Sequence, residues 1–198
     1  FRAAMDEEES SHIDTEDYST LVIIDMPVAE TSGDNVTYST TPLGIIITEK
    51  NVITVCTRGN PVLDEFTDGA VKGVQTNLKT RFILHLMLRI ATKYLQYLKQ
   101  IDKLSSHVER ELRKSMKNSE LIQLLDIEKS LVYFSSSLKG SEITIEKISR
   151  GRVVKLYEED QDLLEDVLIE VRQAIEMSSI YLNILSGTMD AFASVISN

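Results

Sequence analysis

The run EEDQDLLED, from Glu158 to Asp166, holds six carboxylates in nine residues. On a helix, Glu158, Asp162 and Asp166 would share one face, because they are spaced four residues apart. Like charges at that spacing repel each other by about a few tenths of a kcal/mol per pair. A hard divalent cation such as Mg²⁺, which is held by one or two carboxylates plus waters, would relieve this repulsion. The chemistry that the run suggests is therefore cation binding.

A solvated helix face explains the same run without a ligand. Carboxylates in the first helical turn complement the helix dipole, which accounts for the acids from Glu158 to Asp162. The dipole effect fades after that turn and accounts less well for Glu165 and Asp166. The residues alone favour the solvated face and leave a cation site at Asp162 and Asp166 as the alternative.

Motifs for other chemistry are not found in the sequence. His12, His85 and His107 have no partners at metal-ligand spacing, and Cys56 has no evident catalytic partner. There is no glycine-rich phosphate loop, no nucleophile elbow and no HExxH motif. We therefore expect no enzyme activity and no small-molecule substrate.

Composition and charge exclude several classes of protein. The net charge of −10 makes nucleic acid an unexpected partner, because a phosphate backbone requires a basic footprint. A single cysteine excludes a disulfide framework and fits a reducing cytosol. The apolar run FILHLMLRIA is interrupted by His85 and Arg89, so no stretch of about 18 apolar residues occurs. We expect no membrane span within these residues.

The elements that would position the acids begin with a sheet. Residues 1–19 are acidic and short of aliphatic side chains, and β-branched runs separated by turn residues follow. The short links favour antiparallel neighbours. The predicted strands cover residues 20–27, 35–40, 43–48 and 52–57. A short helix should then begin after Asn60, with Pro61 at its first position, and stop at Gly69.

Long helices are predicted after Gly73. The first carries a heptad seam, spaced alternately by four and three residues: Ile83, Met87, Ile90, Tyr94, Tyr97, Ile101, Leu104 and Val108. A break at Lys117-Asn118-Ser119 precedes a second helix, which should reach Gly140 and resume to Ile148. The two helices are predicted to form an antiparallel helical hairpin.

The last helix is predicted to run from about Glu158 to the end of the sequence, roughly 60 Å at 1.5 Å per residue. Its seam has the same alternating spacing: Leu164, Leu168, Val171, Ile175, Ser178, Leu182, Leu185, Met189, Phe192 and Ile196. A narrow stripe on so long a helix favours a seam against other helices over a face docked on a sheet. Since the pattern does not end at Asn198, we expect the helix to continue beyond it.

The last stretch, SGTMDAFASVISN, resembles the stalk-helix segment that precedes the first membrane span in CorA-type magnesium transporters. AAMDEEESSHIDTEDYSTLVIIDMPV resembles the acidic helix–loop and first strand of that family, and GIIITEKNVITVCT resembles its hairpin. The resemblance covers essentially the whole chain in order. It implies a cytoplasmic domain with sheet strands upstream of Phe1, a homopentamer around a pore, and two membrane helices beyond Asn198 in the cell (plasma or inner) membrane.

The resemblance also implies roles for particular acids. Asp166 matches a stalk-helix aspartate of a regulatory Mg²⁺ site between subunits, with Asp162 one turn away on the same face. The partner acid from the neighbouring subunit aligns with Ala3, so Asp6, Glu7 or Glu8 would have to take its place. Asp190 aligns with a stalk aspartate that faces the pore. The implied mechanism is regulatory: bound Mg²⁺ holds the assembly closed, and its loss lets the acidic faces repel and the pore open.

The sequence therefore predicts an α+β fold of the α/β/α type, with a largely antiparallel sheet flanked by helices, a long helical hairpin and a long stalk helix. We expect a sheet-containing part at 1–75, the helical pair at 76–150 and the stalk at 151–198. The predicted function is the regulatory domain of a divalent-cation transporter for Mg²⁺, with Co²⁺, Zn²⁺ and Ni²⁺ left open as the transported ion. The alternatives are a Zn²⁺-transporting relative and a soluble helical interaction module without a transport role.

Overall fold

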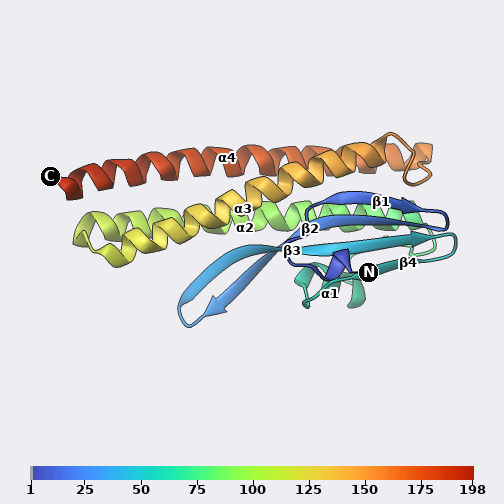
Figure 1. Ribbon diagram of the computed structural model, residues 1–198, viewed down its shortest axis with the longest axis horizontal. Helices are drawn as coiled ribbons and strands as arrows, with labels where there is room; N and C mark the ends of the chain where they lie inside the picture. The colour runs from blue at the N-terminus through green and yellow to red at the C-terminus, as the bar shows by residue number, and fades with distance from the viewer. Residues whose placement is uncertain (1) are drawn as a thin grey trace.

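The computed structural model describes residues 2–198 (Figure 1). Its elements are, in order, the 3₁₀ turn η1 (Ala3–Met5), strands β1 (His12–Glu16), β2 (Ser19–Ser32), β3 (Asn35–Thr48) and β4 (Val52–Val55), helices α1 (Pro61–Thr67), α2 (Lys79–Ser115) and α3 (Asn118–Ser149), the 3₁₀ turn η2 (Glu158–Asp160) and helix α4 (Gln161–Ser197). The four strands pair antiparallel in sequence order. The predicted fold class, with its antiparallel sheet, helical pair and long final helix, is confirmed.

The sheet differs from the prediction in two places. β3 is one strand across Thr41 and Pro42, where two strands were expected. Proline has no N–H to donate, but Pro42 is tolerated here because β4 pairs only with Gly44–Ile47. The β4 ladder does not reach Pro42, so no ladder hydrogen bond is lost on that side. The acidic segment forms the edge strand β1, which the sequence did not predict. Its last three side chains are exposed, so no buried alternation marked it as a strand.

The start of α1 is capped by the expected residue. The Val62 N–H donates to Asn60 Oδ1 over 2.8 Å, which caps the start of α1. Between α2 and α3, Met116 takes a left-handed conformation with φ of 49°. The expected interruption at Gly140 is wrong, because α3 continues through it to Ser149. A Cβ at Gly140 would lie 3.5 Å from Ser11, an ordinary contact distance, so α3 passes next to the start of the sheet without requiring a glycine there.

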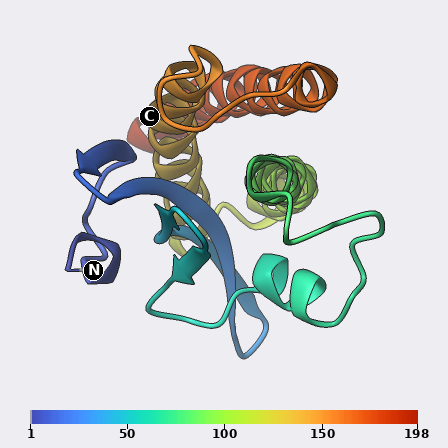
Figure 2. The same cartoon turned by 90° about the vertical axis from the view of Figure 1, so that its right-hand side faces the viewer.

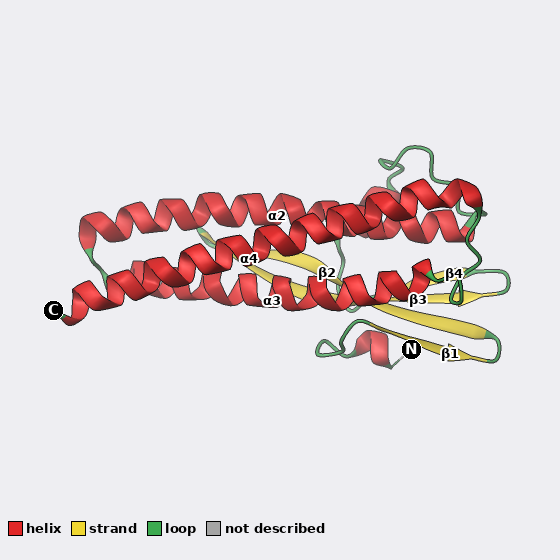
Figure 3. Cartoon of the chain, turned by 90° about the horizontal axis from the view of Figure 1, so that it is seen from above, coloured by secondary structure: helices red, strands yellow, loops and turns green. Residues whose placement is uncertain are grey.

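The molecule has three layers. Helices α2 and α3 cover one face of the sheet, and α4 lies across both helices on their far side (Figures 2 and 3). Because α2 lies between the sheet and α4, it buries more of its circumference than one heptad seam. Tyr94, predicted as a packing residue, is 1% exposed, donates to the Asp25 carbonyl oxygen over 3.1 Å and meets Phe134 edge-on at 5.0 Å.

The opposite face of the sheet holds the N-terminal turn. Successive side chains of a strand point to opposite faces, so Val22 and Ile24 enter the helical core while Ile23 points away from it. Gly44, the partner of Ile23 in β3, leaves room there for η1: a Cβ at Gly44 would lie 2.4 Å from the Cβ of Ala4. This close approach fixes the acidic N-terminal segment to the face of the sheet away from the helices.

Candidate functional site

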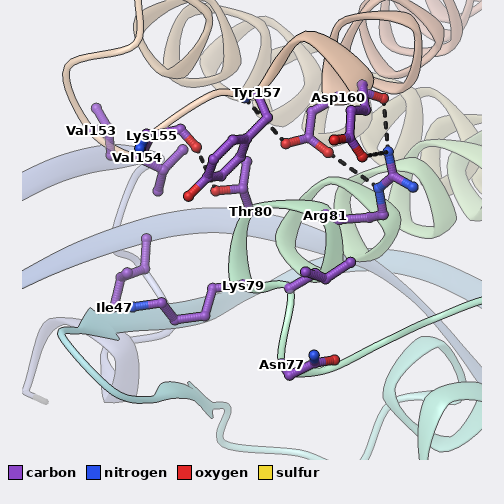
Figure 4. A pocket seen from close by; sticks show the side chains of 12 residues that line it. Ile47, Asn77, Lys79, Thr80, Arg81, Val153, Val154, Lys155, Tyr157 and Asp160 are labelled. Carbon is purple, nitrogen blue, oxygen red and sulfur yellow. Dashed lines mark hydrogen bonds and ion pairs between the residues drawn. The ribbon is translucent and has the colours of Figure 1, made fainter.

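The acidic run is divided by the fold into a structural and a solvent-facing part. Asp160 is 4% exposed; its Oδ1 accepts from Arg81 Nε over 3.2 Å and its Oδ2 from the Tyr157 N–H over 3.4 Å. Arg81 also donates to the Glu159 carbonyl oxygen over 2.8 Å (Figure 4). Asp160 therefore fastens the start of α4 to the first turn of α2, a role that the sequence did not reveal.

A cavity of about 610 Å³ lies beside this ion pair, between the start of α2, the link before α4 and the end of β3 (Figure 4). Thr80 donates to the Lys155 carbonyl oxygen over 2.8 Å. Lys79 Nζ donates to the carbonyl oxygens of Thr48 and Glu49 over 2.9 and 2.6 Å. These polar groups hold the link and the turn after β3 in place, so the cavity belongs to the framework that positions α4.

Apart from the buried Asp160, the acids of the run are exposed, among them Asp162 and Asp166. These two lie one helical turn apart on α4, as the spacing predicted. Neither forms an ion pair with any side chain of residues 2–198, so their mutual repulsion is not offset within the described chain. Their exposure keeps both carboxylates accessible to an ion or to a second molecule.

Asp6 and Glu7, the other predicted cation ligands, follow η1 and lie far from α4. Glu7 is paired with Arg58, with 3.2 Å between Oε1 and Nη2, and Arg58 also contacts Glu30. Asp6 accepts the Glu8 N–H over 3.1 Å. The N-terminal turn and the start of α4 lie on different sides of the molecule, separated by the sheet and the helical pair (Figures 1 and 2).

Within one chain, the structure therefore does not bring the predicted cation ligands together at one site. Within residues 2–198, no group of three or more His, Cys, Asp or Glu side chains is arranged to hold a metal ion. Asp162 and Asp166 form a pair on α4, and Asp6 and Glu7 form a separate group on the far face of the sheet.

The inward face of α4 packs on α2 and α3, as a helix–helix seam should. Its buried side chains are Leu164, Val167, Val171, Ala174, Ser178, Leu185 and Phe192. Val167 and Ala174 lie beside the predicted seam and are buried because α4 contacts two helices at once. Ile196, predicted in the seam, is 46% exposed, so the seam does not extend to this position in the described chain.

The outward face of α4 begins with the two acids and continues with apolar side chains. At 3.6 residues per turn, Asp162 and Asp166 lie on the same side as an exposed stripe of large apolar residues. The stripe consists of Ile169, Ile180, Ile184 and Val195, which are 51%, 46%, 61% and 60% exposed. Asp190 is exposed as well and borders the stripe. One helical segment, Glu158–Ser197, is long and apolar enough by length and composition alone to cross a membrane.

Polar contacts attach α4 to the helical pair along its length. Arg172 binds Glu142 and Glu146 of α3 over 2.8 and 2.9 Å, and these hydrogen bonds raise the pKa of the guanidinium. Farther along, the Ser186 hydroxyl donates to Glu128 over 2.8 Å. The acids at the start of α4 are thus carried on a helix that is held by α2 and α3 for most of its length.

Comparison with known proteins gives a family match over the whole chain. The family model described as CorA-like Mg²⁺ transporter protein matches residues 1–198. The cobalt/magnesium transport protein CorA of Methanocaldococcus jannaschii is 23% identical over 195 residues. That alignment covers 94% of this chain but 58% of the relative, so the chain spans little more than half of that protein.

Solved structures share the fold. The soluble domain of CorA from M. jannaschii superposes with a TM-score of 0.83 at 23% identity, covering 96% of this chain and 75% of that one. The complete CorA structure from the same organism gives 0.85 at 21% identity, covering 99% and 62%. The ZntB cytoplasmic domain from Vibrio parahaemolyticus gives 0.73 at 11% identity, covering 96% and 75%.

Proposed function

The chain belongs to the CorA-like Mg²⁺ transporter family, and from that premise we propose that it is the cytoplasmic regulatory part of a homopentameric divalent-cation transporter. We propose Mg²⁺ as the transported ion and Co²⁺ as a second one, in line with the name of the relative from M. jannaschii. The membrane spans would follow α4, and the protein would lie in the cell membrane with this part facing the cytoplasm. The family match over residues 1–198 is the observation that carries the proposal.

The outward stripe of α4 supports assembly of several copies. Ile169, Ile180, Ile184 and Val195 expose apolar surface along one side of a helix whose other side is already packed. Apolar residues gathered in this way mark an interaction surface. In a ring of identical chains, the α4 helices would bury the stripe against one another and form the stalk. We keep the division into 1–75, 76–150 and 151–198 as part of this proposal.

The separation of the acids supports a cation site that two chains share. Asp166 lies on the outermost helix and Asp6 on the far face of the sheet, so a single chain cannot bring both to one ion. Neighbours in a ring can, because each presents a different side to the next. Asp6 is the better ligand than Glu7, whose charge is already paired with Arg58. Ala3, at the position of the family's partner acid, supplies no carboxylate.

The regulation that we propose depends on differential binding. Mg²⁺ held between Asp166 of one copy and Asp6 of the next, with Asp162 nearby, stabilises the closed ring only because the open ring lacks this site. When Mg²⁺ is scarce, the acidic faces of chains that each carry a net charge of −10 repel one another, and the ring can open. Asp190, exposed on α4, would face the pore and attract the cation.

Thermal unfolding of the chain with Mg²⁺ and with chelator tests the sensing site. Mg²⁺ at about 100 times its dissociation constant should stabilise the protein by about 2.7 kcal/mol. Asp166→Asn should remove most of this gain, whereas Asp126→Asn, at an exposed position on α3, should keep it. Equal melting temperatures with and without Mg²⁺, at protein concentrations that allow assembly, would count against the site.

A Zn²⁺-transporting relative of the same fold is the second candidate, because nothing in residues 1–198 decides which ion is transported. Uptake by the full-length protein in vesicles separates the two, since internal dyes distinguish Mg²⁺ from Zn²⁺. We expect Mg²⁺ uptake. Uptake of Zn²⁺ alone would favour the second candidate, and a full-length protein that transports neither ion would favour a helical interaction module.

A further inference from the structure

The turn between α2 and α3 combines positive charge with exposed apolar side chains. Residues 110–125 contain four Lys or Arg and two Glu, a net charge of +2, while the whole chain has −10 and the rest therefore −12. Beside these bases, Met116, Ile122 and Leu125 are 38%, 57% and 48% exposed. We call Arg110, Arg113, Lys114, Met116, Lys117, Ile122 and Leu125 the basic tip.

The positive charge of the basic tip is largely available to a partner. Arg113 pairs with Glu109 and Lys114 with Glu111, but both pairs are solvent-exposed contacts within one helix, which are weak. Arg110 and Lys117 are exposed, and neither forms an ion pair within residues 2–198. An anionic partner can therefore bind these side chains without first breaking a buried contact.

The basic tip is level with the end of α4. The Arg113 guanidinium lies over the Phe192 ring, 5.4 Å from its centroid. From that contact α2 continues for two residues to Ser115 and α4 for five residues to Ser197, about 3 and 7.5 Å of helix. The two helices run in the same direction, so the α2–α3 turn and the end of α4 lie at one end of the molecule (Figures 1 and 3).

We propose that the basic tip binds the anionic phospholipid headgroups of the membrane into which the chain continues after α4. This step rests on the proposed function, which puts a membrane span directly after that helix. Lysine and arginine near an anionic membrane surface contribute about 1 kcal/mol each, and exposed apolar side chains enter the boundary between headgroups and acyl chains. The helical pair thereby gains an attachment to the bilayer that is separate from α4.

Fluorescence provides a direct test, because the sequence contains no tryptophan. Ile122→Trp places one reporter in the basic tip, and Ile143→Trp places a matched reporter elsewhere on α3, at a position that is 56% exposed. The emission of the Ile122→Trp chain should shift to shorter wavelength with mixed phosphatidylcholine and phosphatidylglycerol vesicles. It should not shift with phosphatidylcholine alone, and the Ile143→Trp chain should not shift with either.

Sedimentation of the unlabelled chain with the same vesicles tests the charges. R110E combined with K117E should weaken binding to the mixed vesicles at least about tenfold. K139E combined with K147E makes the same change in net charge at exposed positions of α3 away from the basic tip, and should leave binding nearly unchanged. Binding should also weaken at high salt.

Three results would overturn the proposal: no emission shift for the folded Ile122→Trp chain, an equal shift for both reporters, or a shift that follows protein concentration rather than lipid. The last result would mean that a second copy covers the basic tip. None of these measurements requires ion transport. A full-length protein that transports no ion would contradict the proposed function without affecting the vesicle result.

Discussion

Arg113 of α2 lies over the ring of Phe192 on α4, and Phe192 is 7% exposed although the residues around it face solvent. Among the described residues after Leu185, Phe192 alone is buried in α4. In the last three turns of α4, Phe192 therefore makes the most buried contact with the helical pair, beside the Ser186–Glu128 hydrogen bond and the partly buried Met189. Movement of the far end of α4 relative to α2 must break the Phe192 contact.

Replacing Phe192 with alanine should release the end of α4 without unfolding the protein. The lost burial removes the main apolar contact of residues 186–197, while the layers from β1 to Leu185 stay packed. Amide hydrogen exchange should show that 186–197 loses protection by at least about tenfold, with little change in α2. Ile196→Ala, at a position that is 46% exposed and outside the apolar stripe, is the control and should change neither. Uniform loss of protection across α2 and α4 would contradict this local role.

Asp25→Asn should stabilise the protein near neutral pH. Asp25 is 8% exposed, and burial raises the pKa of its carboxyl above the ordinary value of 3.8, an effect that a hydrogen bond with Ser137 partly offsets. Removing the charge removes the desolvation penalty, so the variant should gain about 1.4 kcal/mol for each pH unit by which folding raises the pKa. Chemical denaturation at pH 7 measures the gain.

The pH dependence gives this prediction a definite sign. Below pH 3.8 Asp25 is protonated in both states and carries no penalty. As the pH rises to the pKa of the folded state, the unfolded chain loses the proton first, so the wild type loses stability and the advantage of Asp25→Asn grows. Asp14→Asn, on the exposed edge strand, should show no such growth. An advantage that is constant from pH 3 to pH 8 would rule out the buried charge as its cause.

Gly44→Ala should displace the N-terminal turn. The new methyl group would lie 2.4 Å from the Cβ of Ala4, so η1 must move away from β3, at a cost of about 1–3 kcal/mol. If Asp6 helps to bind Mg²⁺, stabilisation by Mg²⁺ should weaken too, although no acid has been removed. Gly59→Ala is the matched control, because a Cβ at Gly59 meets nothing within 4 Å in the described chain. An unchanged melting temperature for Gly44→Ala would show that η1 does not depend on this contact.

The sequence predicted those parts of the fold that local chemistry decides. Asn60 and Pro61 placed the start of α1, and the predicted break at Lys117-Asn118-Ser119 lies within one or two residues of the gap between α2 and α3. It could not predict β1, because an edge strand with exposed side chains lacks the alternation that marks a half-buried strand. Nor did it show that β3 passes through Pro42, which depends on how far β4 extends along its neighbour.

The candidate site was predictable as a set of residues but not as an arrangement. The spacing of Asp162 and Asp166 correctly placed them on one face of α4. The role of Asp160 depends on Arg81, 79 residues earlier in the chain, and no local sequence pattern predicts that pair. The separation of Asp6 from Asp166 follows from the layer order, which sequence periodicity does not specify.

We propose that this domain senses Mg²⁺ and controls a divalent-cation pore. The most direct measurement is Mg²⁺ influx through the full-length protein in vesicles whose internal Mg²⁺ is set either low or at millimolar concentration. We predict influx at low internal Mg²⁺ that is suppressed at high internal Mg²⁺, and Asp166→Asn should keep its influx under both conditions. Two results would contradict the proposal: equal influx through the unaltered protein under both conditions, or no divalent-cation influx under either condition.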